Sequence, residues 1–314
     1  MTKTDSAKVR APRNRTLTFS DAEASELKEL VLHLDGSFEP SNIRNRVICG
    51  DALRVLPALE VGSADLLFCD PPYNLNKDFG QEKFIQTSSD EYERWLDSWI
   101  SLCVPLLKNT ASFYICGDWR SSAAIQRVGT RYFKLQNRIT WEREKGRGAK
   151  ANWKNAAEDI WFFSVSDKFT FNLGAVKQRR RVIAPYRENG KPKDWSESSD
   201  GNFRDTHPSN IWTDITVPFW SMPENTDHPT QKPEKLLAKI LLASTNEGDL
   251  LLDPFAGSGT TAVVAKKLGR EFVAIESDEE YCLLAAKRLV MAESDESIQG
   301  FEDGVFWERN SKKI

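Results

Sequence analysis

The chain contains no apolar run approaching the ~20 residues that a helix needs to cross a bilayer. Its amino-terminal segment is polar and carries lysine, so the apolar centre of a signal peptide is missing as well. From these two absences we expect a protein that stays in the cytoplasm and neither enters a membrane nor is exported.

Clustered metal ligands are also lacking. The five cysteines include no CxxC pair, which argues against a zinc site and against a disulfide framework. The three histidines have no metal-ligand spacing, and no PD-(D/E)xK-like arrangement of carboxylates with a lysine is found. We therefore expect no metal, reduced and mostly buried cysteines, and structural or surface histidines. These residues are Cys49, Cys69, Cys103, Cys116, Cys282, His33, His207 and His228.

The chain lacks a net positive charge, but its positive residues are concentrated in one region. The net charge is −3, yet residues 131–193 hold 16 Lys or Arg against 6 Asp or Glu. A charge run is usually a solvated face. Here aromatic side chains alternate with the basic ones, which favours a surface that neutralises the phosphates of a nucleic acid. The candidate contacts are Arg147, Lys150, Asn152, Lys154, Asn155, Arg179, Arg180 and Arg181.

The composition is that of a folded α/β protein. A chain of 314 residues, 40% of them hydrophobic, can bury one large core and still carry a smaller insertion. Ser88 and Ser277 each precede a glutamate by three residues, which predicts a capping box at two helix starts, and Ser20 is expected to cap another helix over 20–34. The expected strands lie near residues 46, 65, 112, 135, 159, 250 and 272, and the other helices over 88–107, 233–245, 260–268 and 278–293.

A glycine-rich turn follows the expected strand at residues 249–253. Its glycines, Gly257 and Gly259, allow the backbone to approach a ligand closely, and the helix starting at Thr260 presents unpaired N–H groups. The next strand ends in Glu276, 17 positions after Gly259, near the spacing at which a carboxylate accepts hydrogen bonds from ribose. A P-loop lysine and a third glycine at dinucleotide spacing are absent, so a nucleoside without phosphates is favoured over a triphosphate or NAD.

A rigid corner lies about 180 residues upstream, where Asp70-Pro71-Pro72-Tyr73 ends another buried strand. The two prolines prevent the chain from continuing as a helix or a ladder. The Asp70 carboxylate and the Pro71 carbonyl can then face one amino group, with the Tyr73 ring beside them for stacking. Cys69 alternates to the other side of the strand, so we reject a covalent mechanism through its thiol. Both motifs should lie at the carboxyl ends of parallel strands, where open α/β sheets bind ligands.

The pair of motifs resembles the DNA amino-methyltransferases, which move a methyl group from S-adenosylmethionine to the exocyclic amine of adenine or cytosine. The corner precedes the glycine-rich turn, as in the circularly permuted β group typical of restriction-modification systems. The resemblance covers about residues 45–293 and implies a seven-stranded, mostly parallel, doubly wound sheet with an inserted target-recognition region. Six segments carry it in order, namely residues 50–52, 70–73, 113–118, 138–141, 228–233 and 255–259.

The resemblance also implies roles for individual residues. Asp51 should lie by the adenine of the cofactor, Glu276 should hold its ribose and Asp253 should orient its methionine amine through nearby backbone, while residues 228–233 pack over the methionine end. The catalytic set is Asp70, Pro71, Pro72 and Tyr73. The cofactor set is Asp51, Ala52, Asp70, His228, Thr230, Lys232, Asp253, Phe255, Ala256, Gly257, Ser258, Gly259, Thr260, Glu276 and Ser277.

An adenine that is extruded from the duplex is the expected target. Aspartate at the first position of the corner resembles the adenine-specific members, whereas serine is usual among the cytosine-N4 enzymes. Cytosine-N4 methylation stays an alternative, as does a silent DNA-specificity subunit of the same fold. An RNA or protein-amide methyltransferase is disfavoured by the motif order. The expected partners are double-stranded DNA, a cognate restriction endonuclease and a second copy of the chain.

The expected organisation has four parts. Residues 1–18 are a disordered basic arm, residues 19–165 and 228–295 form the catalytic domain, residues 166–227 are the target-recognition insertion, and residues 296–314 are a tail. Residues 74–87 are expected to form a mobile loop that closes over the extruded base.

Overall fold

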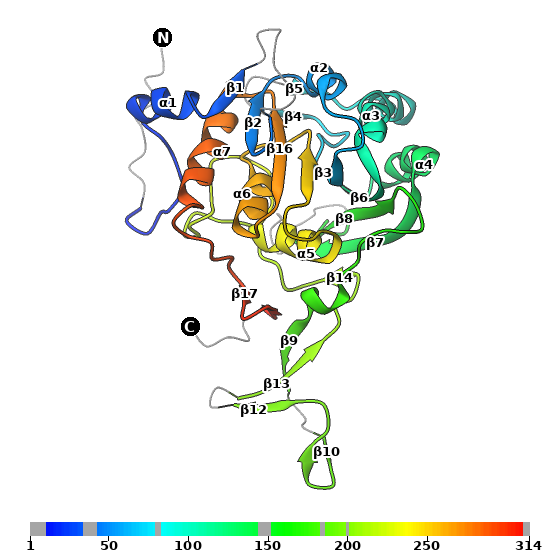
Figure 1. Ribbon diagram of the computed structural model, residues 1–314, viewed down its shortest axis with the longest axis vertical. Helices are drawn as coiled ribbons and strands as arrows, with labels where there is room; N and C mark the ends of the chain where they lie inside the picture. The colour runs from blue at the N-terminus through cyan, green and yellow to red at the C-terminus, as the bar shows by residue number, and fades with distance from the viewer. Residues whose placement is uncertain are drawn as a thin grey trace.

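The computed structural model describes residues 11–33, 43–78, 83–143, 152–182, 186–198 and 201–309. All seven expected strands are present there, and two short edge strands extend them into a nine-stranded sheet (Figure 1). Neighbouring strands run parallel except at β8, which is antiparallel to β6 and β7. The order is β1 (Val31–His33), β2 (Arg46–Cys49), β16 (Glu271–Glu276), β15 (Leu250–Asp253), β3 (Ala64–Cys69), β6 (Leu107–Gly117), β8 (Ala157–Ser164), β7 (Lys134–Glu142) and β14 (Ile211–Trp212).

Helices cover both faces of this sheet (Figure 1). On β3, Leu66 and Phe68 point into one core and Leu67 and Cys69 into the other, because alternate residues of a strand face opposite ways. The first core includes α5 (Glu234–Ser244), α6 (Thr260–Lys267) and α7 (Glu279–Met291), and the second includes α2 (Ala52–Val55), α3 (Ser89–Cys103) and α4 (Ser122–Tyr132). The prediction of a mostly parallel, doubly wound sheet is therefore confirmed.

None of the described helices combines the length and the apolar character that a membrane span requires.

The amino-terminal helix is shorter than expected. Ser20 caps α1 (Asp21–Lys28) through the reciprocal hydrogen bonds with Glu23 that define a capping box. The chain then forms β1, which pairs parallel with β2. The prediction of a helix over 20–34 is wrong beyond Lys28, because the sheet edge offers residues 31–33 ladder partners that no local pattern reveals.

One of the two further capping boxes is correct. Ser88 and Glu91 form the expected box at the start of α3. At α7 the cap is Asp278, whose carboxylate accepts from the N–H groups of Glu280 and Tyr281, so the box expected at Ser277 is wrong. A carboxylate at the cap position satisfies two N–H groups that a serine hydroxyl one residue earlier cannot reach.

The helix α4 is absent from the sequence-based prediction. It contains Gly129, a residue that weakens a helix pattern. A Cβ at this position would lie 2.5 Å from the ring of Phe163 on β8, so the glycine is required by packing of the helix on the sheet.

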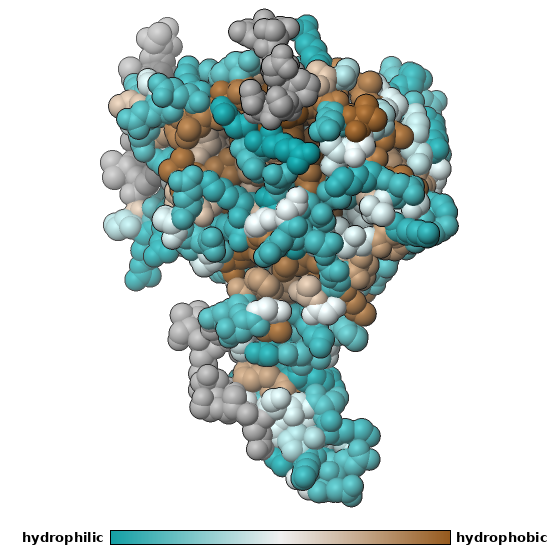
Figure 2. Space-filling view, viewed as in Figure 1, coloured by the Kyte–Doolittle hydropathy of each residue, from teal (hydrophilic) through white to brown (hydrophobic). Residues whose placement is uncertain are grey.

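A small second sheet projects from the body as an arm (Figure 1). Its order is β12 (Ser196–Ser198), β13 (Gly201–Thr206), β9 (Gln178–Arg181), β18 (Val305–Trp307) and β17 (Phe301–Glu302). A hairpin of β10 (Arg187–Glu188) and β11 (Lys191–Pro192) lies near its tip. Since β18 runs parallel to β9, the segments 166–227 and 296–309 share one sheet. The visible surface of the arm is mostly hydrophilic (Figure 2).

Residues 11–18 are attached to the body, which differs from the expected disordered arm. The Arg15 N–H donates to the Trp220 carbonyl at 2.6 Å, and the Leu17 N–H donates to the Asn225 carbonyl at 2.8 Å. Extended backbone can thus join a neighbouring segment despite its low apolar content. Residues 1–10 lie outside the described part of the chain.

The segment expected as a mobile loop is closed at its base. The Asn74 side chain donates to the Thr87 carbonyl at 2.9 Å and accepts from the Thr87 N–H at 2.8 Å. Between them lie the short strands β4 (Lys77–Asp78) and β5 (Lys83–Phe84), while residues 79–82 are outside the described residues. Closure of this loop over a base stays a prediction.

Two glycine substitutions separate backbone strain from packing. Gly248 (φ 79°) has open space around a Cβ, whereas at Gly259 (φ 77°) a Cβ would lie 2.5 Å from the Ala285 Cβ of α7. Left-handed backbone costs other residues about 1–2 kcal/mol, and overpacking adds about 1–3 kcal/mol. In denaturant titrations, Gly259→Ala should therefore lower the free energy of unfolding more than Gly248→Ala; equal losses would contradict the packing argument.

Candidate functional site

A cavity of about 450 Å³ opens at the carboxyl ends of four neighbouring strands, β2, β16, β15 and β3. Parallel α/β sheets place their ligands at this edge, and the volume suits a small molecule. The predicted catalytic and cofactor residues all line the cavity apart from Gly259, which faces α7. The cleft expected from sequence is therefore assembled from motifs far apart in the chain.

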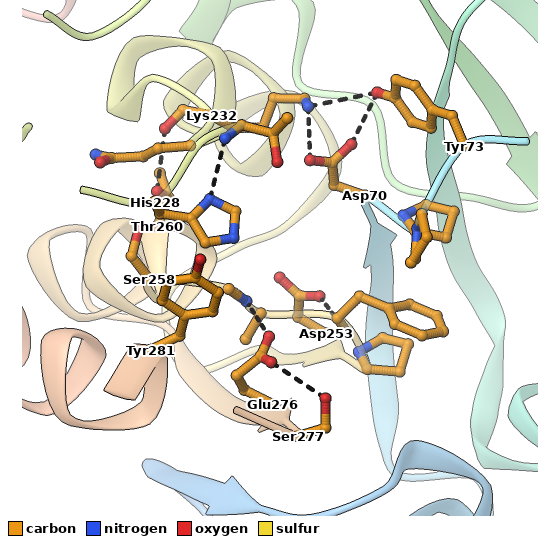
Figure 3. Close-up of a pocket in the computed structure, with 18 of the residues that line it drawn as sticks. Asp70, Tyr73, His228, Lys232, Asp253, Ser258, Thr260, Glu276, Ser277 and Tyr281 are labelled. Carbon is orange, nitrogen blue, oxygen red and sulfur yellow. Dashed lines mark hydrogen bonds and ion pairs between the residues drawn. The ribbon is translucent and has the colours of Figure 1, made fainter. Parts of the chain in front are cut away.

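The Asp70 carboxylate is held on both oxygens (Figure 3). Its Oδ1 accepts from the Tyr73 hydroxyl at 2.8 Å, and its Oδ2 accepts from the Lys232 ammonium at 2.6 Å. The Pro72 carbonyl accepts from the Tyr92 hydroxyl of α3 at 3.0 Å. Burial and the Asp70 charge raise the pKa of Tyr73, so its hydroxyl remains a donor. Hydrogen bonds to the Asp70 side chain and to the Pro72 carbonyl therefore hold the proline corner in place.

Lys232 lies at this corner, although the sequence placed it with the methionine end of the cofactor. Its Nζ is 3.6 Å from Oε2 of Glu158, and the Arg143 guanidinium donates to Oε1 of Glu158 at 2.7 Å. Burial lowers the pKa of Lys232, but the charges of Asp70 and Glu158 raise it by more, so the net shift is upward.

Glu158 lines the cavity but is not among the site residues predicted from the sequence. It stands near the start of β8, where a strand running with its neighbours would be far from the cleft. Because β8 is antiparallel to β6, its amino end reaches the edge where the other strands end. A pair of acids opening an apolar run, Glu158-Asp159, is the signal that the sequence offers, but it does not reveal the direction of the strand.

The opposite half of the cavity is built around Glu276 (Figure 3). Its Oε2 accepts from the Gly257 N–H at 2.8 Å, and its Oε1 accepts from the Asp278 N–H at 2.9 Å. Burial raises the pKa of Glu276. A Cβ at Gly257 would lie 2.9 Å from Nε2 of His228, so close packing inside the protein also requires this glycine.

Asp253 and Asp51 differ in their surroundings. Asp253 is buried at the end of β15 and accepts from the Phe255 N–H at 3.0 Å, and burial raises its pKa to about 7. Asp51 is exposed and caps α2 by accepting from the Leu53 N–H at 2.9 Å. A buried carboxylate has lost its water and needs a partner such as a cationic ligand group, whereas an exposed carboxylate is already hydrated.

Aromatic side chains of α3 complete one wall. The Phe255 ring lies 5.0 Å from the Trp99 ring and 6.0 Å from the Trp95 ring, measured between centroids. Both tryptophans line the cavity. Their spacing of four residues places them on one helix face, but only the docking of α3 on the sheet brings that face to Phe255.

A buried ionic network supports the glycine-rich turn from below. The Arg288 guanidinium of α7 donates to the Ser258 carbonyl at 2.8 Å, the Thr260 hydroxyl at 3.0 Å and Oε1 of Glu234 at 2.9 Å. The Thr260 hydroxyl donates to the Lys232 carbonyl at 3.0 Å. The turn and the backbone of Lys232 are therefore fixed by the same side chain.

The basic residues proposed for nucleic-acid contact are dispersed. Asn155 lines the cavity, and Asn152 and Lys154 are exposed next to it in sequence. Arg147 and Lys150 lie outside the described residues. Arg179, Arg180 and Arg181 lie on β9 of the arm, where Arg179 makes two hydrogen bonds to Asp205.

The residues of the cleft fit S-adenosylmethionine. A nucleoside with an amino-acid side chain needs acceptors for its ribose, an apolar wall and a carboxylate for its ammonium group, and Glu276, Phe255 and Asp253 offer these in one cavity. The described residues contain no group of three His, Cys, Asp or Glu side chains that could hold a metal.

The fold and this cleft define the protein as an S-adenosylmethionine-dependent methyltransferase. Residues 64–287 match the family model described as DNA methylase, and the chain belongs to this family. It is 36% identical over 265 residues to DNA adenine methyltransferase YhdJ of Escherichia coli (strain K12), covering 81% of this chain and 86% of the relative.

A second relative and a solved structure are also similar to the chain. The chain is 34% identical over 262 residues to type II methyltransferase M.HpaI of Haemophilus parainfluenzae, which covers 82% of this chain and 76% of the relative. The crystal structure of an M1.HpyAVI–SAM complex is similar with a TM-score of 0.54 at 25% identity, covering 77% of this chain and 98% of that one.

Arg288→Met tests the network below the turn. The substitution leaves Glu234 with one cationic partner and removes a donor from the Ser258 carbonyl, and breaking a buried ion pair costs about 3–5 kcal/mol. We expect a loss of this size in the free energy of unfolding and weaker binding of S-adenosylmethionine. Lys266→Met, which breaks an exposed ion pair with Glu293, should cost less than about 1 kcal/mol. Similar losses in both variants would contradict a supporting role for Arg288.

Proposed function

We propose that the protein is a site-specific DNA methyltransferase that transfers a methyl group from S-adenosylmethionine to the exocyclic N6 of adenine. The observation that carries this proposal is the meeting of Asp70, at the proline corner, with Asp253 and Glu276 in one cavity. The aspartate that opens the corner and the relative named DNA adenine methyltransferase support adenine as the target.

The reaction requires activation of a weak nucleophile. The lone pair of an aromatic amine is delocalised into its ring. In our proposal Asp70 accepts one N–H of the amine and the Pro71 carbonyl accepts the other, which turns the lone pair out of the ring plane. When bound, S-adenosylmethionine supplies an electrophilic methyl group. Alignment of the amine by the corner can lower the activation free energy by on the order of 7–11 kcal/mol.

The opposite half of the cavity holds the methyl donor in this proposal. The Asp253 carboxylate pairs with the ammonium group of the methionine part, Glu276 accepts from the ribose hydroxyls, and Asp51 receives the adenine amino group. Phe255 supplies an apolar surface backed by the two tryptophans of α3.

The target base must leave the duplex to reach the corner, at a cost of a few kcal/mol. We propose that Lys154 and Asn155 contact DNA beside the cleft and that Arg180 and Arg181 of the arm contact phosphates farther along the duplex. A cognate restriction endonuclease is proposed as a partner, supported by the relative named as a type II methyltransferase. A homodimer and a cytoplasmic location stay predictions.

Asp70→Asn tests the catalytic assignment. The amide no longer accepts a hydrogen bond as an anion, so methyl transfer to plasmid DNA from a methylation-deficient host should fall by about 10²–10³-fold or more. Binding of S-adenosylmethionine, measured by calorimetry, should stay close to that of the unmodified protein. Mass spectrometry of digested DNA identifies the product as N6-methyladenine or N4-methylcytosine.

The control for this variant is Asp167→Asn, which alters an exposed carboxylate that pairs with Lys134. It should leave methyl transfer unchanged. Substantial methylation by Asp70→Asn would refute the role of Asp70, and N4-methylcytosine as the product would refute adenine as the target.

Cofactor binding should depend on pH through Asp253, whose pKa is raised to about 7 by burial. Only the ionised carboxylate attracts an ammonium group, and the protonated form dominates below that pKa. The dissociation constant for S-adenosylmethionine should therefore rise as the pH falls, by up to about tenfold per unit below 7, and level off above it. Asp253→Asn should bind more weakly and show a shallower slope. An equally steep slope in this variant would assign the dependence to another group.

A further inference from the structure

Both oxygens of Asp70 are already engaged by side chains of this protein. The Lys232 ammonium holds Oδ2 at 2.6 Å, and the Tyr73 hydroxyl holds Oδ1 at 2.8 Å. The Lys232 side chain is only 6% exposed. An ammonium group and a target amine both present N–H donors, and with the Tyr73 hydroxyl in place they crowd the same carboxylate.

Charge gives a second reason why Lys232 cannot keep this position during the reaction. Methyl transfer moves the positive charge of the sulfonium onto the target nitrogen. The ammonium of Lys232 remains protonated because neighbouring carboxylates raise its pKa. Two cations on one carboxylate in a water-poor cavity repel each other strongly.

A receiving group for the ammonium stands close by. Nζ of Lys232 is 3.6 Å from Oε2 of Glu158, outside hydrogen-bond range but within reach of a side-chain rotation. This oxygen is buried and has no hydrogen-bond partner among the described residues, which is costly for a carboxylate. Its other oxygen is anchored by Arg143 at 2.7 Å.

The backbone of Lys232 is fixed, whereas its side chain can reach either Asp70 or Glu158. The Lys232 carbonyl accepts from the Thr260 hydroxyl at 3.0 Å, and Arg288 donates to that same hydroxyl. Movement is thus confined to the four-carbon side chain, whose end lies between two carboxylates, Glu158 on β8 and Asp70 just after β3.

We propose that Lys232 is a positioning residue that occupies the amine site on Asp70 and is displaced toward Glu158 when the target base enters. The inference rests on the proposed function. Lys232 then keeps Asp70 oriented between turnovers, and Glu158 compensates the ammonium during transfer. Base entry exchanges one ion pair for another instead of stranding a buried charge.

A double-mutant cycle on the full-length protein tests this inference. Glu158→Gln removes the receiving charge with little change of shape, so kcat/KM for plasmid DNA should fall by about tenfold or more, while the dissociation constant for S-adenosylmethionine stays unchanged. In Lys232→Met no ammonium has to be displaced. Adding Glu158→Gln to that variant should therefore cost nothing further, so the losses of the two single variants should not add.

Lys108→Met is the matched control, because Lys108 pairs with Asp65 at 2.7 Å at the other end of β3. It should leave kcat/KM unchanged. Thermal unfolding reports on folding of every variant, and Lys232→Gln replaces Lys232→Met if the latter does not fold.

Three outcomes decide the matter. A tenfold loss on Glu158→Gln in both backgrounds would overturn the inference, because Glu158 would then act on the base directly. A larger dissociation constant for S-adenosylmethionine in Lys232→Met would also overturn the inference, since Lys232 would then hold the methyl donor. An unmodified protein that methylates no DNA would instead refute the proposed function.

Discussion

The parallel pairing of β15 with β3 is the constraint on which the site depends. Leu251 pairs with Leu66 and Leu252 with Leu67, so the ends of the two strands lie side by side. Neighbouring strands are about 4.8 Å apart. The proline corner and the glycine-rich turn therefore open into one cavity although most of the chain lies between them. Any slip in this register would separate Asp70 from Asp253.

Buried charges around the cleft are paired with opposite charges in small groups. Asp70, Lys232 and Glu158 form one group, and Arg288, Glu234 and Lys267 form another below the turn. A buried ion is tolerated when partners replace the water it loses, and such partners also fix its position before a ligand arrives. The same pairs thus stabilise the fold and prepare the cleft for a charged reaction.

The arm is joined to the cleft through α5. Lys235, in the first turn of this helix, donates to the Trp307 carbonyl of β18 at 2.6 Å and to the Asp214 carbonyl at 2.9 Å. Lys232 lies three positions earlier in the chain and reaches Asp70. One short segment therefore connects the sheet of the arm, which carries the proposed DNA-contact surface, with the corner that carries the proposed catalytic group.

The sequence alone was sufficient for the seven strands, the sheet class and the two motifs, because apolar runs, prolines and glycines act through local backbone geometry. It could not place Glu158, since strand direction depends on pairing partners, nor Trp95, since helix docking sets which face meets Phe255. The resemblance implied only that Lys232 belongs to the segment over the cofactor, and it could not reveal that the ammonium pairs with Asp70. Adjacent residues determine the local backbone geometry and the chemical groups of each motif. Packing determines which charges meet, because ion pairs form between groups that only the tertiary structure brings together.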